Sequence, residues 1–379
     1  MRFLSLRFLL VLLVSVLMQP ALAQISAPTL AARSWVLVDH GSGQVLAGNE
    51  ADTRIEPASL TKLMTAYLTF AALKAGTITA EQEVLVSEAA WRQEGSRMFI
   101  EVGTRVTVGE LIRGVIVVSG NDACVALSEL IAGSEQGFAE MMNREAQRLG
   151  MTNTHFTNSA GLPDPAHYSS ARDLATLAGA VIRDFPEYYS LYSTREFTYN
   201  NIKQPNRNRL LWIDPTVDGM KTGHTAGAGY CLVASALRGP RRLISVVLGT
   251  GSENVRAQES QKLLNFGFQF YDTVKLYAAD QSLSKFRVWK GARNEVNAGF
   301  TQDLVLSLPK GKADKVEATL ESKQPVFAPL SKGQEIGTLK LSIDGQPFGE
   351  YPVVALEDVG IAGFFGRLWD AILLWFKSL

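Results

Sequence analysis

The sequence predicts a mixed α+β domain with an antiparallel sheet flanked by helices, followed by a small all-β domain and a terminal amphipathic helix. Strand patterns stand at both ends of residues 34–271 with helical patterns between them, which favours this arrangement over repeated βαβ units. After Tyr271 the pattern changes to short alternating runs that are typical of strands. A length of 379 residues is too great for one typical domain and agrees with this division.

The composition is that of a globular protein and excludes several classes. Hydrophobic residues make up 46% of the chain, which excludes wholesale disorder. The 37 basic residues balance the 37 acidic ones, so the chain lacks the excess positive charge that binds phosphates, and we expect no nucleic-acid partner. Two cysteines are too few for a disulfide scaffold or a cysteine-rich zinc site.

The pattern of the first 23 residues is typical of a secretory signal peptide. Arg2 and Arg7 supply positive charge, an apolar run covers residues 8–18, and the small residues Ala21 and Ala23 form a cleavage signal. A retained membrane anchor is the alternative, but the run is short for a bilayer span, which needs about 20 residues. We therefore expect cleavage after Ala23 and export from the cytoplasm.

The α+β domain is expected to begin with a hairpin and to end with two strands and a helix. Residues 34–38 alternate as a strand, and residues 44–47 return after a turn at 40–43. Pro57 then opens a helical run that extends through Leu73. The last expected elements are strands at 229–237 and 242–249, joined by a Gly-Pro turn, and a helix at 253–271.

The region after Tyr271 contains almost no clustered catalytic residue types. Its alternating runs include residues 338–343, after which Asp344 and Gly345 form a hairpin turn. We therefore expect an all-β domain that spaces the first domain from the terminal helix. The expected segments are a signal peptide at 1–23, a catalytic domain at 24–271, a β-rich domain at 272–357 and a terminal helix at 358–379.

The terminal segment predicts an amphipathic helix that lies flat on a membrane surface. A wide aromatic face with a charged back is typical of helices in a lipid interface, and the charged residues argue against a membrane span. Packing against the protein's own core is the alternative. The apolar face comprises Ile361, Phe364, Phe365, Leu368, Trp369, Ile372, Leu373, Trp375, Phe376 and Leu379, the charged back comprises Arg367, Asp370 and Lys377, and Leu374 is the one misfit.

A serine and a lysine stand three positions apart at the start of the expected helix. This spacing places Ser59 and Lys62 on one face, so the amine reaches the hydroxyl. The unpaired N–H groups of a first helical turn favour a developing oxyanion. The lysine acts as a base only if desolvation or a neighbouring cation lowers its pKa. The same spacing recurs at Ser282–Lys285 and Ser307–Lys310, where no helix start is expected.

A second triplet, Ser119-Gly120-Asn121, follows an apolar run. Its hydroxyl and amide stand at alternate positions and can point into one cleft, although the triplet also fits a capped helix end. The same SxN spacing recurs at Ser252–Asn254.

A third triplet, Lys221-Thr222-Gly223, leads with His224 into an expected strand. The glycine lets a ligand backbone approach the strand edge, the lysine supplies a cation, and the threonine can bind a carboxylate.

The order SxxK, SxN, KTG is the signature of serine β-lactamases and penicillin-binding proteins. The chain resembles, over nearly its whole length, the low-molecular-mass penicillin-binding proteins that are D-alanyl-D-alanine carboxypeptidases. This resemblance implies a β-lactamase/transpeptidase-like fold, the peptidoglycan pentapeptide stem as substrate, β-lactams as inhibitors, no cofactor or metal, and the periplasmic face of the bacterial inner membrane. The segments that carry it are EPASLTKLMT, LIRGVIVVSGNDACVAL, NSAGLPDPAHYSS, NRNRLLW and VDGMKTGHTAGAGYCLVASA.

The resemblance also implies a role for each catalytic residue. Ser59 would attack the penultimate carbonyl of the stem, with Lys62 as its base, and release D-alanine from an acyl-enzyme that water then hydrolyses. Ser119 would relay a proton beside Lys221.

The resemblance implies substrate-binding roles as well. Thr222 and Arg207 would hold the terminal carboxylate, and the backbone N–H groups of Ser59 and His224 would form the oxyanion hole. The implied substrate-binding set is Asn121, which positions the peptide, with Lys221, Thr222, Gly223, His224 and Arg207.

Other functions remain as alternatives. A class A β-lactamase has SDN where this chain has Gly120, and its deacylating glutamate lies in an ExxLN segment, which Glu196 to Asn200 matches incompletely, so we interpret Glu196 as structural. A Ser-His-Asp hydrolase is disfavoured because the chain has no GxSxG elbow, and its four histidines offer no HExxH metal pair. A non-catalytic envelope scaffold is the third alternative. Cys124 and Cys231 are expected to be buried free thiols, with a disulfide, which export would permit, as the alternative.

Overall fold

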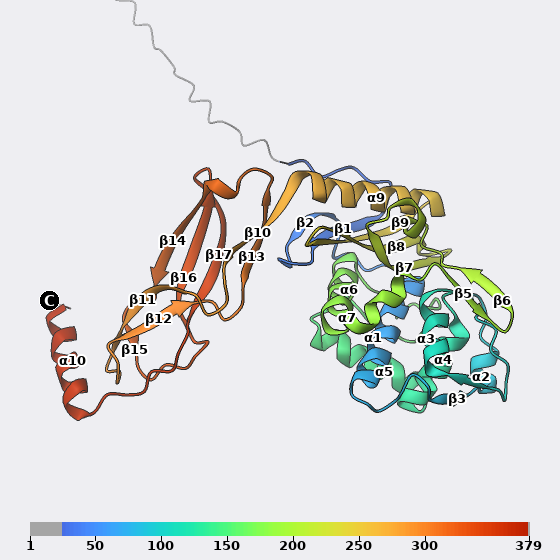
Figure 1. Cartoon of the computed structure of the whole chain (residues 1–379), viewed down its shortest axis with the longest axis horizontal. Helices are drawn as coiled ribbons and strands as arrows, with labels where there is room; N and C mark the ends of the chain where they lie inside the picture. The colour runs from blue at the N-terminus through green and yellow to red at the C-terminus, as the bar shows by residue number, and fades with distance from the viewer. Residues whose placement is uncertain (1–24, 378–379) are drawn as a thin grey trace, which may run out of the picture.

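The computed structural model describes residues 25–377, and the expected signal peptide lies outside them. Two bodies and a terminal helix follow one another along the chain (Figure 1). The first body contains a sheet with helices on both faces, and the second is built of strands. The fold class predicted from the sequence is therefore confirmed.

The sheet of the first body has five antiparallel strands in the order β2-β1-β9-β8-β7. Successive residues of β1 point to opposite faces of the sheet and pack in two separate cores. Val36 lies in the larger core among the helices of one face, and Leu37 lies in the core of the opposite face, under the helix at 253–270. Strand β7 forms one edge of the sheet. The strands are β1 (Ser34–Asp39), β2 (Val45–Asn49), β7 (Val217–Thr225), β8 (Gly229–Arg238) and β9 (Arg241–Thr250).

Helix α9 (Glu253–Phe270) covers one face of this sheet, and the remaining helices gather on the other (Figure 1). These helices are α1 (Lys62–Lys74), α2 (Glu88–Trp91), α3 (Val108–Ile116), α4 (Asn121–Ala132), α5 (Glu135–Arg148), α6 (Ala171–Asp184) and α7 (Pro186–Tyr189). The exception is the short helix α8 (Leu210–Ile213), whose Leu210 and Leu211 pack in the core under α9. Two small antiparallel sheets pair β3 (Glu83–Leu85) with β4 (Arg105–Thr107) and β5 (Glu196–Tyr199) with β6 (Ile202–Pro205).

The helix expected from Pro57 begins with a tighter turn. A 3-10 turn, η1 (Ala58–Thr61), precedes α1, and Ala58 has a positive φ of 48°. The chain therefore turns sharply just before the serine of the SxxK motif.

The second body packs around its own apolar core. It contains a two-stranded sheet, β10 (Tyr271–Tyr277) with β13 (Leu304–Pro309), and a six-stranded sheet in the order β14-β16-β17-β12-β11-β15. The six strands are β11 (Ser282–Trp289), β12 (Glu295–Gly299), β14 (Val316–Ser322), β15 (Val326–Phe327), β16 (Glu335–Ile343) and β17 (Gln346–Ala355), with a 3-10 turn η3 at Ala313–Lys315.

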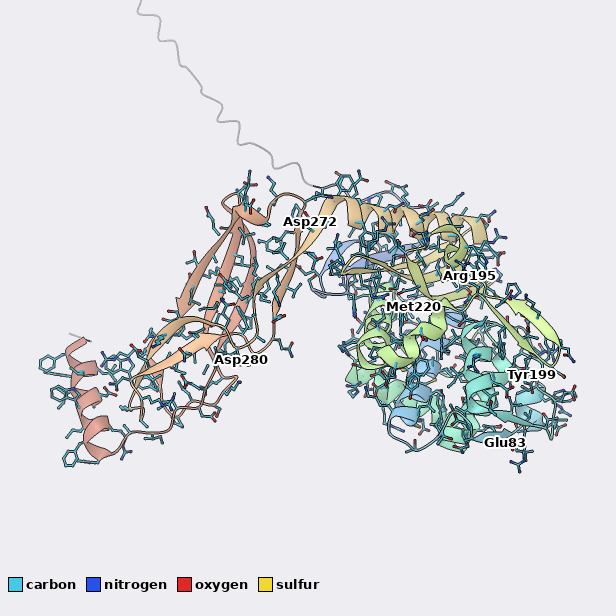
Figure 2. The ribbon with its side chains drawn as sticks, viewed as in Figure 1. Glu83, Arg195, Tyr199, Met220, Asp272 and Asp280 are labelled. Atoms are coloured by element: carbon cyan, nitrogen blue, oxygen red, sulfur yellow. The ribbon has the colours of Figure 1, made fainter. Side chains whose placement is uncertain are left out.

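Polar contacts join the two bodies at β10. The buried carboxylate of Asp39 accepts from Arg241 at 2.8 Å and from the hydroxyl of Thr273 at 2.5 Å. The hydroxyls of Ser42 and Ser307 lie 2.8 Å apart. Figure 2 labels Asp272 at this junction and Asp280 further into the β-rich body.

The chain ends in helix α10 (Phe364–Lys377), at the far end of the β-rich body from the sheet of the first body (Figure 1). Within the described part of the chain, no helix is long and apolar enough to cross a bilayer.

Candidate active site

Ser59 lies in the 3-10 turn that leads into α1, and its side chain is half-buried. Two glycines from distant segments press against this turn. A Cβ on Gly161 would lie 1.8 Å from the carbonyl oxygen of Ala58, and one on Gly223 would lie 3.0 Å from that of Pro57. The turn is therefore wedged between the loop before α6 and strand β7, which fixes the position of the serine.

Lys62 begins α1 and is 1% exposed. Its Nζ lies 2.7 Å from Oδ1 of Asn121, 2.7 Å from the carbonyl oxygen of Ala160 and 3.0 Å from Oγ of Ser59. A carbonyl oxygen only accepts, so two N–H groups point away from the serine. The third tetrahedral position of a neutral amine is a lone pair that faces Oγ of Ser59, which is the arrangement a general base needs.

Burial lowers the pKa of the Lys62 amine below its usual 10.5. The nearby guanidinium of Arg207 acts in the same direction. The sequence analysis required desolvation or a neighbouring cation to lower this pKa, and the structure provides both.

Ser119 occupies the bend between α3 and α4 with a φ of +63° and is buried. Its hydroxyl lies 3.0 Å from Nζ of Lys221. The N-cap position of α4 is occupied by Gly120, which has no side chain that could cap the helix. The alternative of a capped helix end is therefore wrong, because the hydroxyl of Ser119 turns toward the lysine.

The third triplet lies on the edge strand β7. Lys221, which follows the Met220 labelled in Figure 2, is buried and lies 3.0 Å from both Ser119 Oγ and the carbonyl oxygen of Thr222. Burial lowers the pKa of this amine well below 10.5, and the proximity of Lys62 lowers it further. Two buried lysines therefore share one cleft, and their protonation is coupled.

Asn121 begins α4 and uses both ends of its amide within the protein. Its Nδ2 donates to the carbonyl oxygen of Glu94 at 2.6 Å, which fixes Oδ1 on the side of Lys62. In this structure the amide thus orients the lysine, a contact that the role expected for it did not include.

A cleft of about 270 Å³ opens above these residues. It is lined by Ser59, Ser119, Arg207, Thr222, Gly223 and His224, together with Ser96, Tyr230, Glu253 and Arg256. All the expected site residues therefore line this cleft or, like Lys62, Asn121 and Lys221, lie in contact with residues that do.

Four lining residues were missed by the sequence analysis, and Arg256 is the most informative. It is 3% exposed and its guanidinium lies within 3.5 Å of the carbonyl oxygens of Gly223 and Arg207. Arg256 pairs at 3.3 Å with Glu253, which also lines the cleft, so Arg207 and Arg256 together leave a net positive charge at this end. The sequence position of Arg256, inside a helical pattern, carries no functional signal, because only the packing of α9 across the sheet brings it to β7.

The duplicate motifs lie elsewhere. Ser252 caps α9 by accepting from the amide of Val255 at 3.2 Å. Ser282 and Ser307 lie on strands of the β-rich body and not at a helix start. Of the SxxK copies in the described residues, the one at Ser59 therefore stands at a helix start.

The residues that the alternative functions would use also lie outside the lining of the cleft. Glu196 is exposed on a hairpin and pairs with Lys203 at 2.7 Å. His167 is buried, accepts from the amide of Thr157 at Nδ1, and therefore donates from Nε2 to Thr61 at 2.8 Å. Burial lowers its pKa to about 4, so it is a neutral packing residue.

The two cysteines are buried free thiols, as expected. Burial raises the pKa of Cys124 to about 12 and also raises that of Cys231. Both thiols therefore stay protonated near neutral pH.

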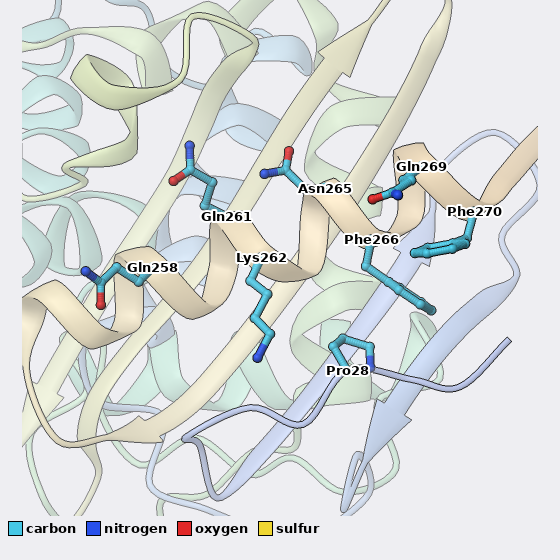
Figure 3. A pocket seen from close by; sticks show the side chains of 8 residues that line it. All are labelled: Pro28, Gln258, Gln261, Lys262, Asn265, Phe266, Gln269 and Phe270. Carbon is cyan, nitrogen blue, oxygen red and sulfur yellow. The ribbon is translucent and has the colours of Figure 1, made fainter.

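A larger hollow, of about 480 Å³, lies on the outer face of α9 (Figure 3). Amide side chains such as Gln258, Gln261 and Gln269 line it beside Phe270. Its lining holds no serine beside a buried lysine, so size alone does not identify the reactive cleft.

Comparisons with known proteins agree with this geometry. Residues 22–252 match the family described as D-alanyl-D-alanine carboxypeptidase, peptidase S11, and residues 271–360 match the C-terminal domain of penicillin-binding protein 5. The chain is 45% identical over 366 residues to the D-alanyl-D-alanine carboxypeptidase DacC of Escherichia coli, covering 93% of this chain and 92% of that protein.

Solved structures of penicillin-binding proteins are also similar to this chain. Penicillin-binding protein 5 of Haemophilus influenzae is 46% identical with a TM-score of 0.86, covering 88% of this chain and 99% of that one. Penicillin-binding protein D2 of Listeria monocytogenes, solved with ampicillin bound, is 29% identical with a TM-score of 0.59, covering 64% of this chain and 99% of that one.

Proposed function

The chain belongs to the peptidase S11 family of D-alanyl-D-alanine carboxypeptidases, and from this membership we propose how its residues remove the terminal D-alanine from a peptidoglycan pentapeptide. The protein is a serine-type carboxypeptidase that works through an acyl-enzyme. One observation carries the assignment of residues: the amine of Lys62 is held by two carbonyl acceptors with its remaining position toward Ser59.

In the acylation step, Lys62 takes the proton of Ser59 as Oγ attacks the penultimate carbonyl carbon. The distance of 3.0 Å between the amine and the hydroxyl supports this direct transfer. The negative charge that develops on the carbonyl oxygen is stabilised by the backbone N–H groups of Ser59 and His224. Because the turn that carries Ser59 is wedged in place, the nucleophile needs little rearrangement to reach the substrate.

The leaving D-alanine needs a proton on its nitrogen. Ser119 supplies it and receives in turn the proton that Lys62 took from Ser59, passed on through Lys221, whose Nζ lies 3.0 Å from the hydroxyl. Water then attacks the acyl-enzyme and the same groups act in reverse. Two lysines in one buried cleft favour this exchange, since charge on one disfavours charge on the other.

The free carboxylate of the substrate binds at the cationic end of the cleft. Thr222 and Arg207 bind it there, with the buried guanidinium of Arg256 behind them. β-Lactams present a carboxylate and a strained amide in the same order and acylate Ser59. The ampicillin-bound relative supports this inhibition.

A β-lactamase is the alternative of the same fold. The exposed position of Glu196, paired with Lys203, speaks against it as a deacylating base. We therefore assign slow deacylation of β-lactams to this enzyme.

The proposal extends to the ends of the chain. Export by the signal peptide at 1–23 would bring the catalytic domain (24–271) to the periplasm, with the β-rich domain at 272–357 as a spacer and the segment 358–379 as the anchor on the inner membrane. Helix α10 supports the anchor because its aromatic side chains are turned outward, and Phe365 is 82% exposed.

The test compares release of D-alanine from a pentapeptide with hydrolysis of penicillin. We expect the wild-type protein to release D-alanine and to hydrolyse penicillin slowly, and Ser59→Ala to lose both activities. Ser282→Ala, which alters the duplicate SxxK motif, is the matched control and should keep both. Rapid penicillin hydrolysis without D-alanine release would favour the β-lactamase, and activity in Ser59→Ala would exclude this serine as the nucleophile.

A further inference from the structure

Asp122, directly after the SxN motif, has a buried carboxylate that binds backbone amides. It is 1% exposed. Its oxygens accept from the N–H groups of Met98 at 3.0 Å, Phe99 at 2.9 Å and Ile100 at 3.3 Å, and from its neighbour Ala123 at 2.9 Å. Three consecutive amides of a distant loop therefore converge on one side chain.

The glycine in the middle of the SxN motif makes room for this carboxylate. A Cβ on Gly120 would lie 2.8 Å from Oδ1 of Asp122 and 3.2 Å from the amide nitrogen of Met98. Any larger side chain would push the carboxylate or the loop away. The packing around Asp122 therefore favours glycine at position 120.

The loop that Asp122 holds, residues 94–100, belongs to the wall of the cleft. Ser96 lines the cleft, and its carbonyl oxygen accepts from the amide of Asn121 at 2.7 Å. The carbonyl oxygen of Glu94 accepts from Nδ2 of Asn121, which turns Oδ1 toward Lys62. The position of this loop thus decides the orientation of an amide that touches the catalytic amine.

We propose that Asp122 is a positioning residue for the acylation step, acting through the loop 94–100 and Asn121 on Lys62. This inference rests on the proposed function of Lys62 as the base. Asp122 itself touches no substrate. The carboxylate binds the loop amides, the loop carbonyl orients Asn121, and Asn121 holds the amine with its lone pair toward Ser59.

Two substitutions test the proposal from opposite sides. Asp122→Asn replaces an oxygen acceptor by an N–H₂ group that faces backbone donors. Gly120→Ala leaves the carboxylate intact and crowds it from the other side. We expect both to reduce kcat for D-alanine release and the rate of acylation by penicillin about tenfold or more, since small misplacements of catalytic groups are costly. KM should change less than about threefold, because the carboxylate-binding end lies on other elements.

A matched control and a second readout separate positioning from general stability. Asp214 is a buried carboxylate that binds the amide and hydroxyl of Thr216 in the loop before β7. Asp214→Asn should lower the melting temperature and retain kcat. Hydrogen exchange should accelerate at residues 98–100 in Asp122→Asn and not in Asp214→Asn.

Unchanged kcat and acylation in folded Asp122→Asn, or unchanged exchange at residues 98–100, would overturn the positioning role, as would an equal loss of kcat in Asp214→Asn. If the wild-type protein is acylated by penicillin but releases no D-alanine, the proposed function fails while acylation of the variants still decides the role of Asp122. If penicillin does not acylate the wild-type protein at all, both proposals fail.

Discussion

At the scale of single residues, the chemistry depends on one buried amine. Lys62 is nearly inaccessible to water, and desolvation favours its neutral form. Its charged form is the inactive one in acylation, so the rate must rise with pH as the amine loses its proton. Because the pKa is lowered from 10.5, this rise falls at a lower pH than for an exposed lysine.

Part of the active site could be predicted from the sequence. The SxxK, SxN and KTG motifs could be found because each is a local pattern, with its spacing fixed by a helix turn or a strand. The sequence could not predict that Arg256 and Ser96 line the cleft, or that the carboxylate of Asp122 binds the amides of residues 98–100. These contacts form where segments that are distant in the sequence pack together. The local periodicity of a sequence predicts helices and strands, but it does not predict which distant segments come into contact.

At the scale of elements, α10 is the part whose sequence pattern predicts its environment. Consecutive helical residues lie about 100° apart, so Leu368 and Ile372, two positions either side of Asp370, are about 160° away from it. Asp370 is 8% exposed and accepts from the backbone amide of Lys290, while both apolar residues are exposed. The apolar face therefore points away from the β-rich body.

The one misfit of the helical pattern has a physical reason. Leu374 lies four positions after Asp370, about 40° around the helix, and is half-buried. It therefore lies on the side that faces the protein, where an apolar residue packs well. Part of the charged side of α10 therefore packs against the β-rich body, which the sequence pattern alone did not predict.

The anchor is tested by changing the outward face of α10. We expect Phe365→Glu with Trp369→Glu to move most of the protein from vesicles of anionic phospholipid to the soluble fraction, since two large apolar contacts are replaced by repelled charges. Sedimentation with the vesicles measures this change. Arg367→Gln, on the back of the helix, is the control and should reduce binding only slightly. Undiminished sedimentation of the double variant would exclude α10 as the anchor.

At the scale of the whole molecule, a buried ion pair within the first body, Arg241 with Asp39, accepts a hydrogen bond from Thr273 of the second body. Asp39 is fully buried, and Arg241 and Thr273 donate to its carboxylate. Burial alone raises the pKa of this carboxyl, but the hydrogen bonds from Thr273 and Arg241 outweigh it, so the net shift is downward from 3.8. A lowered folded-state pKa contributes stability at neutral pH, which is lost as the pH falls below 3.8 through the folded-state value.

Removing this carboxylate tests the junction. Asp39→Ala leaves Arg241 nearly buried without its partner and should lower the free energy of unfolding by about 3–5 kcal/mol in urea titrations at neutral pH. Asp52→Ala removes an exposed pair with Arg172 and should cost less than about 1 kcal/mol. Equal losses in the two variants would show that burial of the junction pair adds nothing.

The division into two bodies could be predicted from the sequence, because the change of periodicity after Tyr271 is strong and local. The contacts at the junction could not. Asp39 stands in an ordinary hairpin pattern, and its partners lie more than two hundred positions away in the sequence.

The central claim, that a neutral amine at Lys62 activates Ser59, is tested most directly by the pH dependence of acylation. The rate constant for penicillin adduct formation on the peptide that contains Ser59 would be followed by mass spectrometry from about pH 5 to about pH 11. We predict a rate that rises with pH and levels off with an apparent pKa below 10.5, with no adduct in Lys62→Met. A rate that rises only near 10.5, or an adduct that forms normally in Lys62→Met, would contradict the account.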